Sequence, residues 1–175
     1  MRFAEPGGSL DTGGMGVIVR TARDTDVERL TQIWFDGWRD GHLAIVPAAL
    51  ARLRTFDSFR ARLQAALPEV RVAVESDRPI GFAILKGDEL YQFFVAAEAR
   101  GTGVAADLMA DAEQQLANRG VTTAWLACAI GNDRAARFYE KRGWRRTATI
   151  RYQAETAEGP FPIENWRYEK QLIRT

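Results

Sequence analysis

The stretch 98-EARGTGVAADLM-109 places an arginine and two glycines between an apolar run and an amphipathic segment. Glycine loses more conformational entropy on folding than any other residue, so Gly101 and Gly103 need a structural reason. A strand, a tight turn and a helix in this order provide one, because the first amides of a helix have no internal partners and that end of the helix is positive. Glycines let a phosphate approach such amides closely, and Arg100 adds a positive charge. The stretch therefore predicts an anion site at the start of a helix.

Two known nucleotide-binding patterns can be compared with this stretch. A Walker loop requires a lysine directly after its last glycine, and no lysine follows Gly103. The sequence GTGVAA, residues 101–106, matches the dinucleotide pattern G-x-G-x-x-G/A. That pattern also requires an acidic residue about 20 positions on, and residues 122–131, TTAWLACAIG, contain none. The remaining alternative for this motif alone is an ordinary tight turn that leads into a helix.

The periodicity of apolar residues predicts one α/β (α+β) domain over residues 17–175, with a mixed, mostly antiparallel sheet flanked by helices in the order β-αα-βββ-α-β-α-ββ. Strands are predicted at residues 17–22, 69–76, 78–87, 88–97, 122–130, 144–153 and 164–173, and helices at 25–41, 47–67, 102–118 and 133–143. Asp24 is the predicted N-cap of the first helix, the second helix breaks near Thr55, and Gly120 ends the third. The glycine-rich residues 1–16 are predicted to be a flexible extension outside the fold.

The composition limits the partners that the chain is expected to have. Its 175 residues include 24 Lys and Arg against 23 Asp and Glu, a net charge of +1, which gives no support for binding to nucleic acid or to an anionic membrane. No apolar run approaches the roughly 20 residues that span a bilayer. Cys128, the only cysteine, lies in an apolar run, so a buried inert thiol is favoured over a nucleophile. We expect a cytoplasmic protein with no metal site and no internal disulfide.

A second motif, GNDRAARFYEKRGW at residues 131–144, follows one predicted strand after the glycine turn. Together, RGTGVA and N-x-x-A-x-x-F-Y-E-K-x-G-W resemble the GNAT superfamily of acetyl-CoA-dependent N-acyltransferases. Arg100, Gly103 and Ala105 match that family's pyrophosphate pattern, Q/R-x-x-G-x-G/A. The predicted strand order is also similar, so the resemblance covers about residues 17–173. It implies a central strand that splays from its neighbour, and acetyl transfer from acetyl-CoA to a primary amine by direct attack on the thioester.

The resemblance implies a set of cofactor-binding residues. The backbone of the splayed strand, at Phe93, Phe94 and Val95, would hydrogen-bond the pantetheine arm. The amides of the turn would bind the pyrophosphate, through residues Arg100, Gly101, Thr102, Gly103, Val104 and Ala105. Asn132 matches the family asparagine that contacts the cofactor arm, and its plain alternative is a cap before the following helix.

The resemblance also implies catalytic roles. Tyr139 matches the tyrosine often placed near the thioester sulfur, where a phenol can protonate the leaving thiolate; its plain alternative is a half-buried aromatic side chain. The amide of Val95 is expected to stabilise the oxyanion. Some relatives carry a glutamate five residues before the asparagine, where this chain has Ala127. Other relatives place an acid on the splayed strand, where Glu89 and Gln92 are the nearest candidates. Glu89 is the predicted base, and its plain alternative is a solvated charge at the start of a strand.

The acceptor is expected to be an amine of a small molecule or a peptide. Trp38 and His42 lie in a segment that often borders the acceptor pocket in the family, and Phe161 is a candidate lid. The plain alternative for His42 is a polar surface residue. A homodimer through exposed apolar residues of the last strands is a further expectation. Because Ala127 replaces the glutamate, a non-catalytic acyl-CoA-binding module stays open as the alternative function.

Overall fold

The computed structural model describes residues 16–173 of the chain. Seven strands form one sheet in the order β1-β2-β3-β4-β5-β7-β6. The strands are β1 (Ile18–Thr21), β2 (Val70–Glu75), β3 (Arg78–Lys86), β4 (Glu89–Val95), β5 (Thr123–Ala129), β6 (Arg145–Ala154) and β7 (Phe161–Gln171). The helices are α1 (Val27–His42), α2 (Ala48–Leu53), α3 (Phe56–Ala66), α4 (Val104–Asn118) and α5 (Asp133–Lys141). The predicted element order is confirmed, and residues 1–15 of the predicted extension lie outside the described residues.

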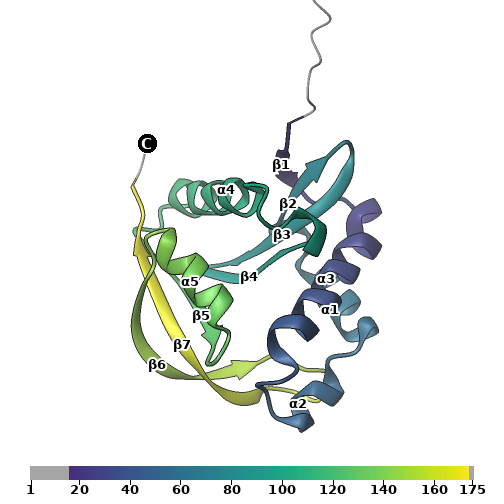
Figure 1. The fold of residues 1–175 in the computed structure, drawn as a ribbon, viewed down its shortest axis with the longest axis vertical. Coiled ribbons are helices and arrows are strands. Elements are labelled where there is room, and N and C mark those ends of the chain that lie inside the picture. The colour runs from purple at the N-terminus through teal and green to yellow at the C-terminus, as the bar shows by residue number, and fades with distance from the viewer. Residues whose placement is uncertain (1–15, 174–175) are drawn as a thin grey trace, which may run out of the picture.

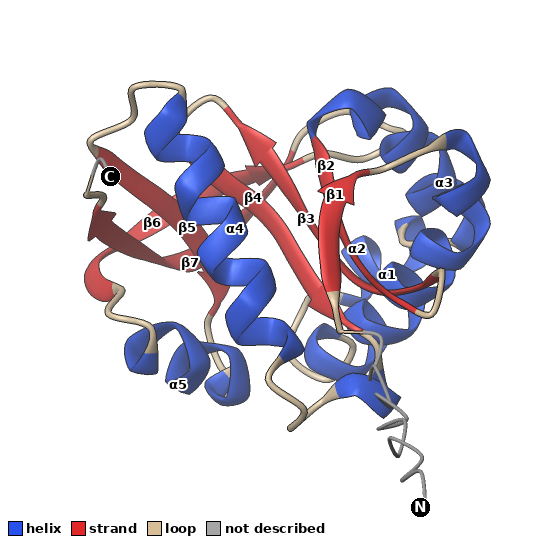
Figure 2. Cartoon of the chain, turned by 90° about the horizontal axis from the view of Figure 1, so that it is seen from above, coloured by secondary structure: helices blue, strands red, loops and turns tan. Residues whose placement is uncertain are grey.

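Two hydrophobic cores lie on opposite faces of the sheet. α4 and α5 lie over one face, and α1 and α3 lie over the other (Figures 1 and 2). Along β3, Ala83 and Leu85 are buried in the first core, and Phe82 and Ile84 in the second, as the alternation of a strand requires. Because both faces of its central strands are covered, these strands are held in place, and so are the residues at their ends.

The sheet is joined at its centre by a short parallel contact. The other described strand pairs are antiparallel, whereas β4 and β5 are parallel and pair only at Glu89 and Trp125. Trp125 N–H donates to Asp88 O at 3.1 Å beside that pair. Beyond it, β4 stays paired with β3 as far as Val95, and β5 stays paired with β7 as far as Ala129. The two strands therefore diverge, which agrees with the splayed central strand that the resemblance implies.

The start of α1 differs from the prediction. Asp24 begins a short 3-10 turn, Asp24–Asp26, rather than capping α1, so its predicted N-cap role is wrong. The carboxylate that stabilises this turn belongs to Asp26, which is buried. It accepts from Arg23 N–H at 2.8 Å and from Arg20 at 2.7 and 3.1 Å. Asp26 therefore ties the start of α1 to β1, a role that local sequence spacing does not reveal.

The other two helix boundaries are confirmed. Thr55 Oγ1 accepts from Ser58 N–H at 3.1 Å, so α2 ends before Thr55 and α3 begins with a side-chain cap. Gly120 has a φ of +89°, and Val121 N–H donates to Leu116 O at 3.1 Å, which is the hydrogen bond of a glycine-ended helix.

We expect Asp26→Asn to destabilise the fold, because the ion pair with Arg20 would be lost at a buried position; such a loss typically costs about 1–3 kcal/mol. Burial raises the pKa of Asp26, but hydrogen bonds from Arg20 and Arg23 outweigh burial and hold that pKa below its usual value. A lowered folded pKa stabilises the protein above the unfolded pKa, and this contribution is lost as the pH falls through the folded pKa. Urea unfolding should therefore show the full difference at pH 7 and a smaller one near pH 3.

Glu28→Gln is the matched control for this prediction. The Glu28 side chain is 69% exposed and pairs with Arg60 on the surface, where ion pairs contribute little. Its unfolding midpoint should match that of the wild type. If the Asp26→Asn midpoint also matched it, the stabilising role of Asp26 would be refuted.

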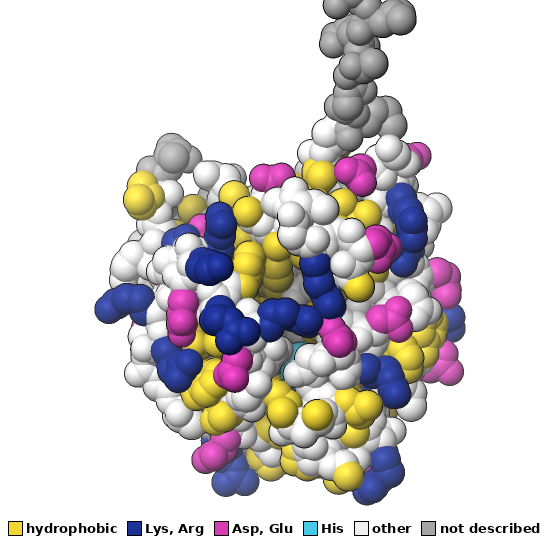
Figure 3. Space-filling view, in the orientation of Figure 1, with side chains coloured by type: hydrophobic (Ala, Val, Ile, Leu, Met, Phe, Trp, Pro, Cys, Tyr) yellow, Lys and Arg dark blue, Asp and Glu magenta, His cyan; other side chains and the backbone are white. Residues whose placement is uncertain are grey.

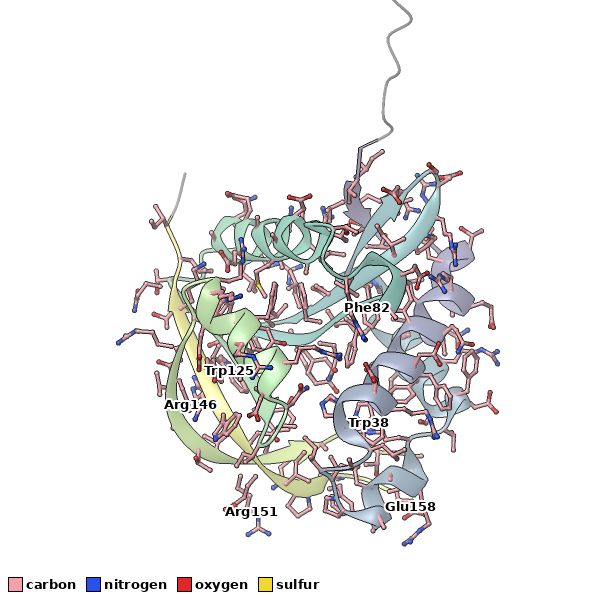
Figure 4. All side chains as sticks on the ribbon, in the orientation of Figure 1. Trp38, Phe82, Trp125, Arg146, Arg151 and Glu158 are labelled. Atoms are coloured by element: carbon pink, nitrogen blue, oxygen red, sulfur yellow. The ribbon has the colours of Figure 1, made fainter. Side chains whose placement is uncertain are left out.

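The outer strand β6 presents polar side chains to solvent. Its first five residues, 145–149, are exposed, and Arg151 projects from the strand into solvent (Figure 4). Within β6 and β7 no large hydrophobic side chain is exposed, although Ile173 beyond β7 is. Of the two predicted last strands, only the second, residues 164–173, thus has a large exposed apolar side chain, that of Ile173, and the homodimer stays a prediction. No helix within residues 16–173 is long and apolar enough to cross a membrane.

Candidate active site

The glycine turn takes a backbone conformation that only glycine adopts easily. Gly101 and Gly103 have φ values of +76° and +90°, in the left-handed region. α4 begins directly afterwards, and Asp107 N–H donates to Gly103 O at 3.1 Å. The amides of the first helical turn before Asp107 therefore have no partner inside the helix. A Cβ built on either glycine would meet no atom within 4 Å, so the space before the turn is open, as an anion site requires.

A cleft of about 300 Å³ extends from this turn along β4 and is termed the α4 cleft. It is lined by Gly37, Gly41, His42, Phe93, Phe94, Val95, Arg100, Gly101, Ala105, Asn132, Arg134, Ala135, Phe138 and Tyr139. Its lining comes from α1, β4, the glycine turn, α4 and α5, and none of it from β5. Of the predicted cofactor residues, Thr102, Gly103 and Val104 do not line it. Thr102 Oγ1 donates to Ala99 O and Val104 is buried in the core, so these two residues shape the turn.

The polar groups of the β4 backbone face in two directions. Along an antiparallel pair, successive residues direct their N–H and C=O groups alternately toward the partner strand and away from it. Ala96 N–H donates to β3 at 2.8 Å, so the register places the polar groups of Phe94 toward β3 and those of Phe93 and Val95 toward the gap. The Phe94 carbonyl oxygen indeed lies 3.1 Å from the position of a Cβ on Gly81. The prediction that the Phe94 backbone is available to a cofactor is therefore wrong, and its side chain lines the α4 cleft instead.

A charged bridge lies beside the α4 cleft. Asp40 Oδ2, on α1, is 3.0 Å from both Arg100 Nη1 and Arg134 Nη2. Hydrogen bonds from Arg134 and Arg100 hold the pKa of Asp40 below its usual value. Figure 3 shows basic side chains next to hydrophobic ones around a hollow at the centre of this face. The sequence prediction missed Arg134, although it stands two residues after Asn132 in the second motif. Both arginines place positive charge near the open glycine turn.

Asn132 and Tyr139 reach the α4 cleft from α5. Asn132 Oδ1 accepts from Ala135 N–H at 3.4 Å, which is the cap given as its plain alternative, and the residue also lines the cleft. Tyr139 is 9% exposed and packs against Phe138 and Tyr168. Burial raises the pKa of Tyr139 well above its usual value, so its hydroxyl keeps the proton at neutral pH. Tyr139 therefore enters the cleft as a hydrogen-bond or proton donor.

A smaller cavity of about 80 Å³, termed the inner pocket, lies on the opposite face of the β4–β5 gap. It is lined by Trp38, His42, Val46, Leu50, Arg54, Arg62, Tyr91, Gln92, Ala127, Ala129, Tyr152, Ala154, Glu155, Ile163 and Asn165. Trp38 and Trp125 lie on opposite sides of the centre of the molecule (Figure 4). Ala127 lines the pocket with a methyl group, so it offers no base there. Phe161 lines neither cavity and packs against the core under α1 and α3, so it does not form the lid that was predicted.

His42 lines both the α4 cleft and the inner pocket. Its Nδ1 lies 3.1 Å from Trp38 O, and since a carbonyl only accepts, Nδ1 donates and Nε2 keeps a lone pair. The two rings stack with centroids 5.3 Å apart. Burial lowers the pKa of His42 to about 4, so the ring is neutral at pH 7. His42, the only histidine of the chain, is visible inside the central hollow in Figure 3.

Glu89 is buried rather than solvated, so its plain alternative is wrong. It is 7% exposed and lines neither cavity. Its Oε1 accepts from the Tyr152 hydroxyl at 2.8 Å, and Tyr152 lines the inner pocket. Burial raises the pKa of Glu89, against the opposing effect of the Tyr152 hydrogen bond. Glu89 therefore reaches the inner pocket only through Tyr152, a residue that sequence reasoning did not find.

A comparison with protein-family models decides the family of this chain. The model described as the Acetyltransferase (GNAT) family matches residues 27–144. The chain belongs to the GNAT family. As a GNAT enzyme it transfers an acetyl group from acetyl-CoA to an amine.

Individual GNAT relatives agree with this assignment. The chain is 29% identical over 154 residues to peptidyl-lysine N-acetyltransferase YjaB of Escherichia coli (strain K12), covering 88% of this chain and 98% of the relative. A GCN5-related N-acetyltransferase from Rhodopseudomonas palustris has a TM-score of 0.69 at 20% identity, covering 89% of this chain and 95% of its own. PaiA N-acetyltransferase from Thermoplasma acidophilum, in complex with coenzyme A, has a TM-score of 0.62 at 16% identity, covering 90% and 99%.

The α4 cleft of this GNAT chain has the chemistry that acetyl-CoA requires. The helix N-terminus with Arg100 and Arg134 suits a pyrophosphate, because it combines free amides with positive charge. The gap-facing N–H and C=O groups of Phe93 and Val95 suit the amides of a pantetheine arm, which would pair with them as an added strand does. The residues present therefore fit the acyl donor of the family.

Proposed function

We propose that the chain acetylates a primary amine that enters from the inner pocket and meets the thioester at the β4–β5 gap. The observation that carries this proposal is the position of His42, which lines the α4 cleft on one side and the inner pocket on the other. An acyl donor in the first cavity and an amine in the second would thus approach each other across the splayed strands. His42 and Trp38 then act as acceptor-binding residues.

The donor side of the reaction uses the α4 cleft. Acetyl-CoA supplies the thioester that the amine attacks. A gap-facing amide of β4, that of Phe93 or Val95, donates to the thioester carbonyl oxygen and stabilises its developing charge. Tyr139 Oη holds a proton beside the sulfur and gives it to the departing thiolate. Amides of the glycine turn, with Arg100 and Asn132, hold the remainder of the donor.

The acceptor side uses Tyr152 and Glu89. The attacking amine must lose a proton, and Glu89 is too deeply buried to take it directly. Tyr152 Oη takes the proton from the amine, directly or through one water, as its own proton passes to Glu89 Oε1 across their 2.8 Å hydrogen bond. The raised pKa of Glu89 makes it a stronger base than an ordinary carboxylate, and burial is the main cause.

We expect Glu89→Gln to lower kcat/KM about 100-fold, as the loss of a general base typically does. Because Glu89 must be ionised to act, and its pKa is raised, the wild-type rate should fall as the pH drops through that raised value. The variant should lose this acidic limb of its pH profile. Glu158→Gln is the control, since Glu158 is exposed in the loop between β6 and β7, near the lower edge of the molecule in Figure 4. An unchanged acidic limb in Glu89→Gln would refute the relay.

The proposal is tested by calorimetric titration with acetyl-CoA, followed by thiol release across primary amines. Because the E. coli relative is named a peptidyl-lysine acetyltransferase, a lysine peptide belongs beside amino acids and polyamines. Binding with turnover on any amine supports the proposal. Binding without turnover on every amine would contradict it and favour the non-catalytic acyl-CoA-binding module.

We also infer a cytoplasmic location, supported by the single cysteine of the chain, Cys128, which is buried and free. Burial raises the pKa of its thiol to about 12, which suits an inert side chain. Fractionation of the host cells tests the location.

A further inference from the structure

The inner pocket contains a buried guanidinium that has no carboxylate partner. Arg54 is 7% exposed, and it forms no ion pair within residues 16–173. One terminal nitrogen donates to the backbone carbonyl of Glu155, while the Nε–H is buried and has no acceptor. A buried donor without a partner is costly, so such groups usually mark a ligand or water. Burial lowers the pKa of Arg54 only to about 10, and it stays charged at pH 7.

Glu155 attracts Arg54 electrostatically, but no acid forms an ion pair with it within the described residues. Arg62 also lines the inner pocket and donates to Tyr91 Oη at 2.8 Å, a neutral partner. The Glu155 carboxylate also lines the pocket, but it pairs with Lys86 of β3. Glu89, the other acid nearby, is bonded to Tyr152 outside the lining. Two cations, Arg54 and Arg62, thus line the pocket against one carboxylate, that of Glu155, and the excess charge of the lining is positive.

The same pocket also contains a buried acceptor without a donor. Asn165, on β7, is 6% exposed, and its Oδ1 is buried and has no hydrogen-bond partner. It pairs in the sheet with Ala129, the last residue of β5, at the open end of the gap. An N–H group placed there would satisfy it. The pocket therefore offers an unpaired acceptor beside the gap and an unpaired cationic donor at Arg54.

We propose that the acceptor is a small amino acid-like amine whose amino group donates to Asn165 Oδ1 near His42 and whose carboxylate binds Arg54. This inference rests on the proposed function. A planar guanidinium matches a carboxylate in geometry and charge, and a volume of about 80 Å³ suits a few heavy atoms rather than a folded segment. The side chain of a peptidyl lysine brings an amine but no carboxylate, so it would leave Arg54 unsatisfied.

The test compares matched substrates on the same enzyme. Amino acids with α-, β- or ω-amino groups are each paired with their carboxamide, and thiol release gives kcat/KM for both. The wild type should prefer the carboxylate member of the best pair by roughly 10- to 100-fold, as a charge-assisted hydrogen bond predicts. In Arg54→Gln the preference should fall to within about threefold. Because the ratio uses one preparation, a loss of folded protein cancels.

Arg52→Gln is the matched control, since Arg52 lies in α2 two residues before Arg54 and is exposed; it should keep the wild-type ratio. If Arg54→Gln does not fold, two other results test the inference. The wild type should still prefer the carboxylate over the carboxamide, and Arg62→Gln should reduce that preference. Equal rates on carboxylate and carboxamide, or turnover on lysine peptides alone, would overturn this inference and leave the acetyltransferase function standing. No turnover on any amine, despite acetyl-CoA binding, would overturn the proposed function itself.

Discussion

Replacing Gly103 with aspartate should weaken acetyl-CoA binding at least about 100-fold. Gly103 has a φ of +90°, a conformation that costs an L-residue roughly 1–2 kcal/mol. The added carboxylate would also stand at the N-terminus of α4, where a pyrophosphate needs the same amides and the same positive field. Calorimetric titration of acetyl-CoA into the variant measures the loss of affinity directly.

Gly159→Asp separates backbone strain from loss of the anion site. Gly159 has a φ of +98° and open space around it, like Gly103, but it lies between β6 and β7 and not at the N-terminus of α4. Both variants should lose thermal stability to a similar extent, while only Gly103→Asp loses affinity. Wild-type affinity in Gly103→Asp would mean that the glycine turn has no part in binding the donor.

Removing the hydroxyl of Tyr139 should lower kcat about 100-fold and leave acetyl-CoA affinity within about twofold of the wild type. The ring of Tyr139→Phe would still pack against Phe138 and Tyr168, so the fold should persist. The variant would lack only the hydroxyl and its proton, which Tyr139 retains at neutral pH because burial raises its pKa. Stopped-flow or steady-state thiol release gives kcat, and calorimetry gives the affinity.

Tyr168→Phe is the control for the hydroxyl of Tyr139. The Tyr168 hydroxyl donates to Glu140 at 2.9 Å and accepts from Arg146 at 3.1 Å, and the residue does not line the α4 cleft. Its kcat should stay within about twofold of the wild type. If Tyr139→Phe had the same kcat as Tyr168→Phe, the proposed general-acid role of Tyr139 would be refuted.

The parts of the site that the sequence predicts are those encoded by neighbouring residues. Gly101 and Gly103 signal their positive φ by residue type alone, and Asn132 signals the start of α5 in the same way. These signals, with the order of the strands, were sufficient for the fold and for the conformation of the glycine turn. The break at Thr55 could be predicted for the same reason. Threonine is a favoured N-cap residue, and its hydroxyl accepts from an amide only three positions later in the chain.

The parts that the sequence does not predict depend on distant pairings. Arg54 and Asn165 line one pocket from segments more than 100 positions apart, with no spacing that connects them. The direction of the Phe94 backbone depends on the register against β3, where the pairing shifts between Ile84 and Leu85. Whether Glu89 is solvated depends on Tyr152, which arrives with β6. Such features need the assembled sheet.

The single pair between β4 and β5 is the weakest connection in the seven-stranded sheet. Four strands lie on one side of Glu89 and Trp125, and three lie on the other. A donor arm along β4 would act as the strand that is missing from the gap, and an amine held by Asn165 would brace the opposite side. With both substrates bound, the two parts of the sheet would therefore be held more rigidly. After the products leave, the sheet would be less constrained than during the reaction.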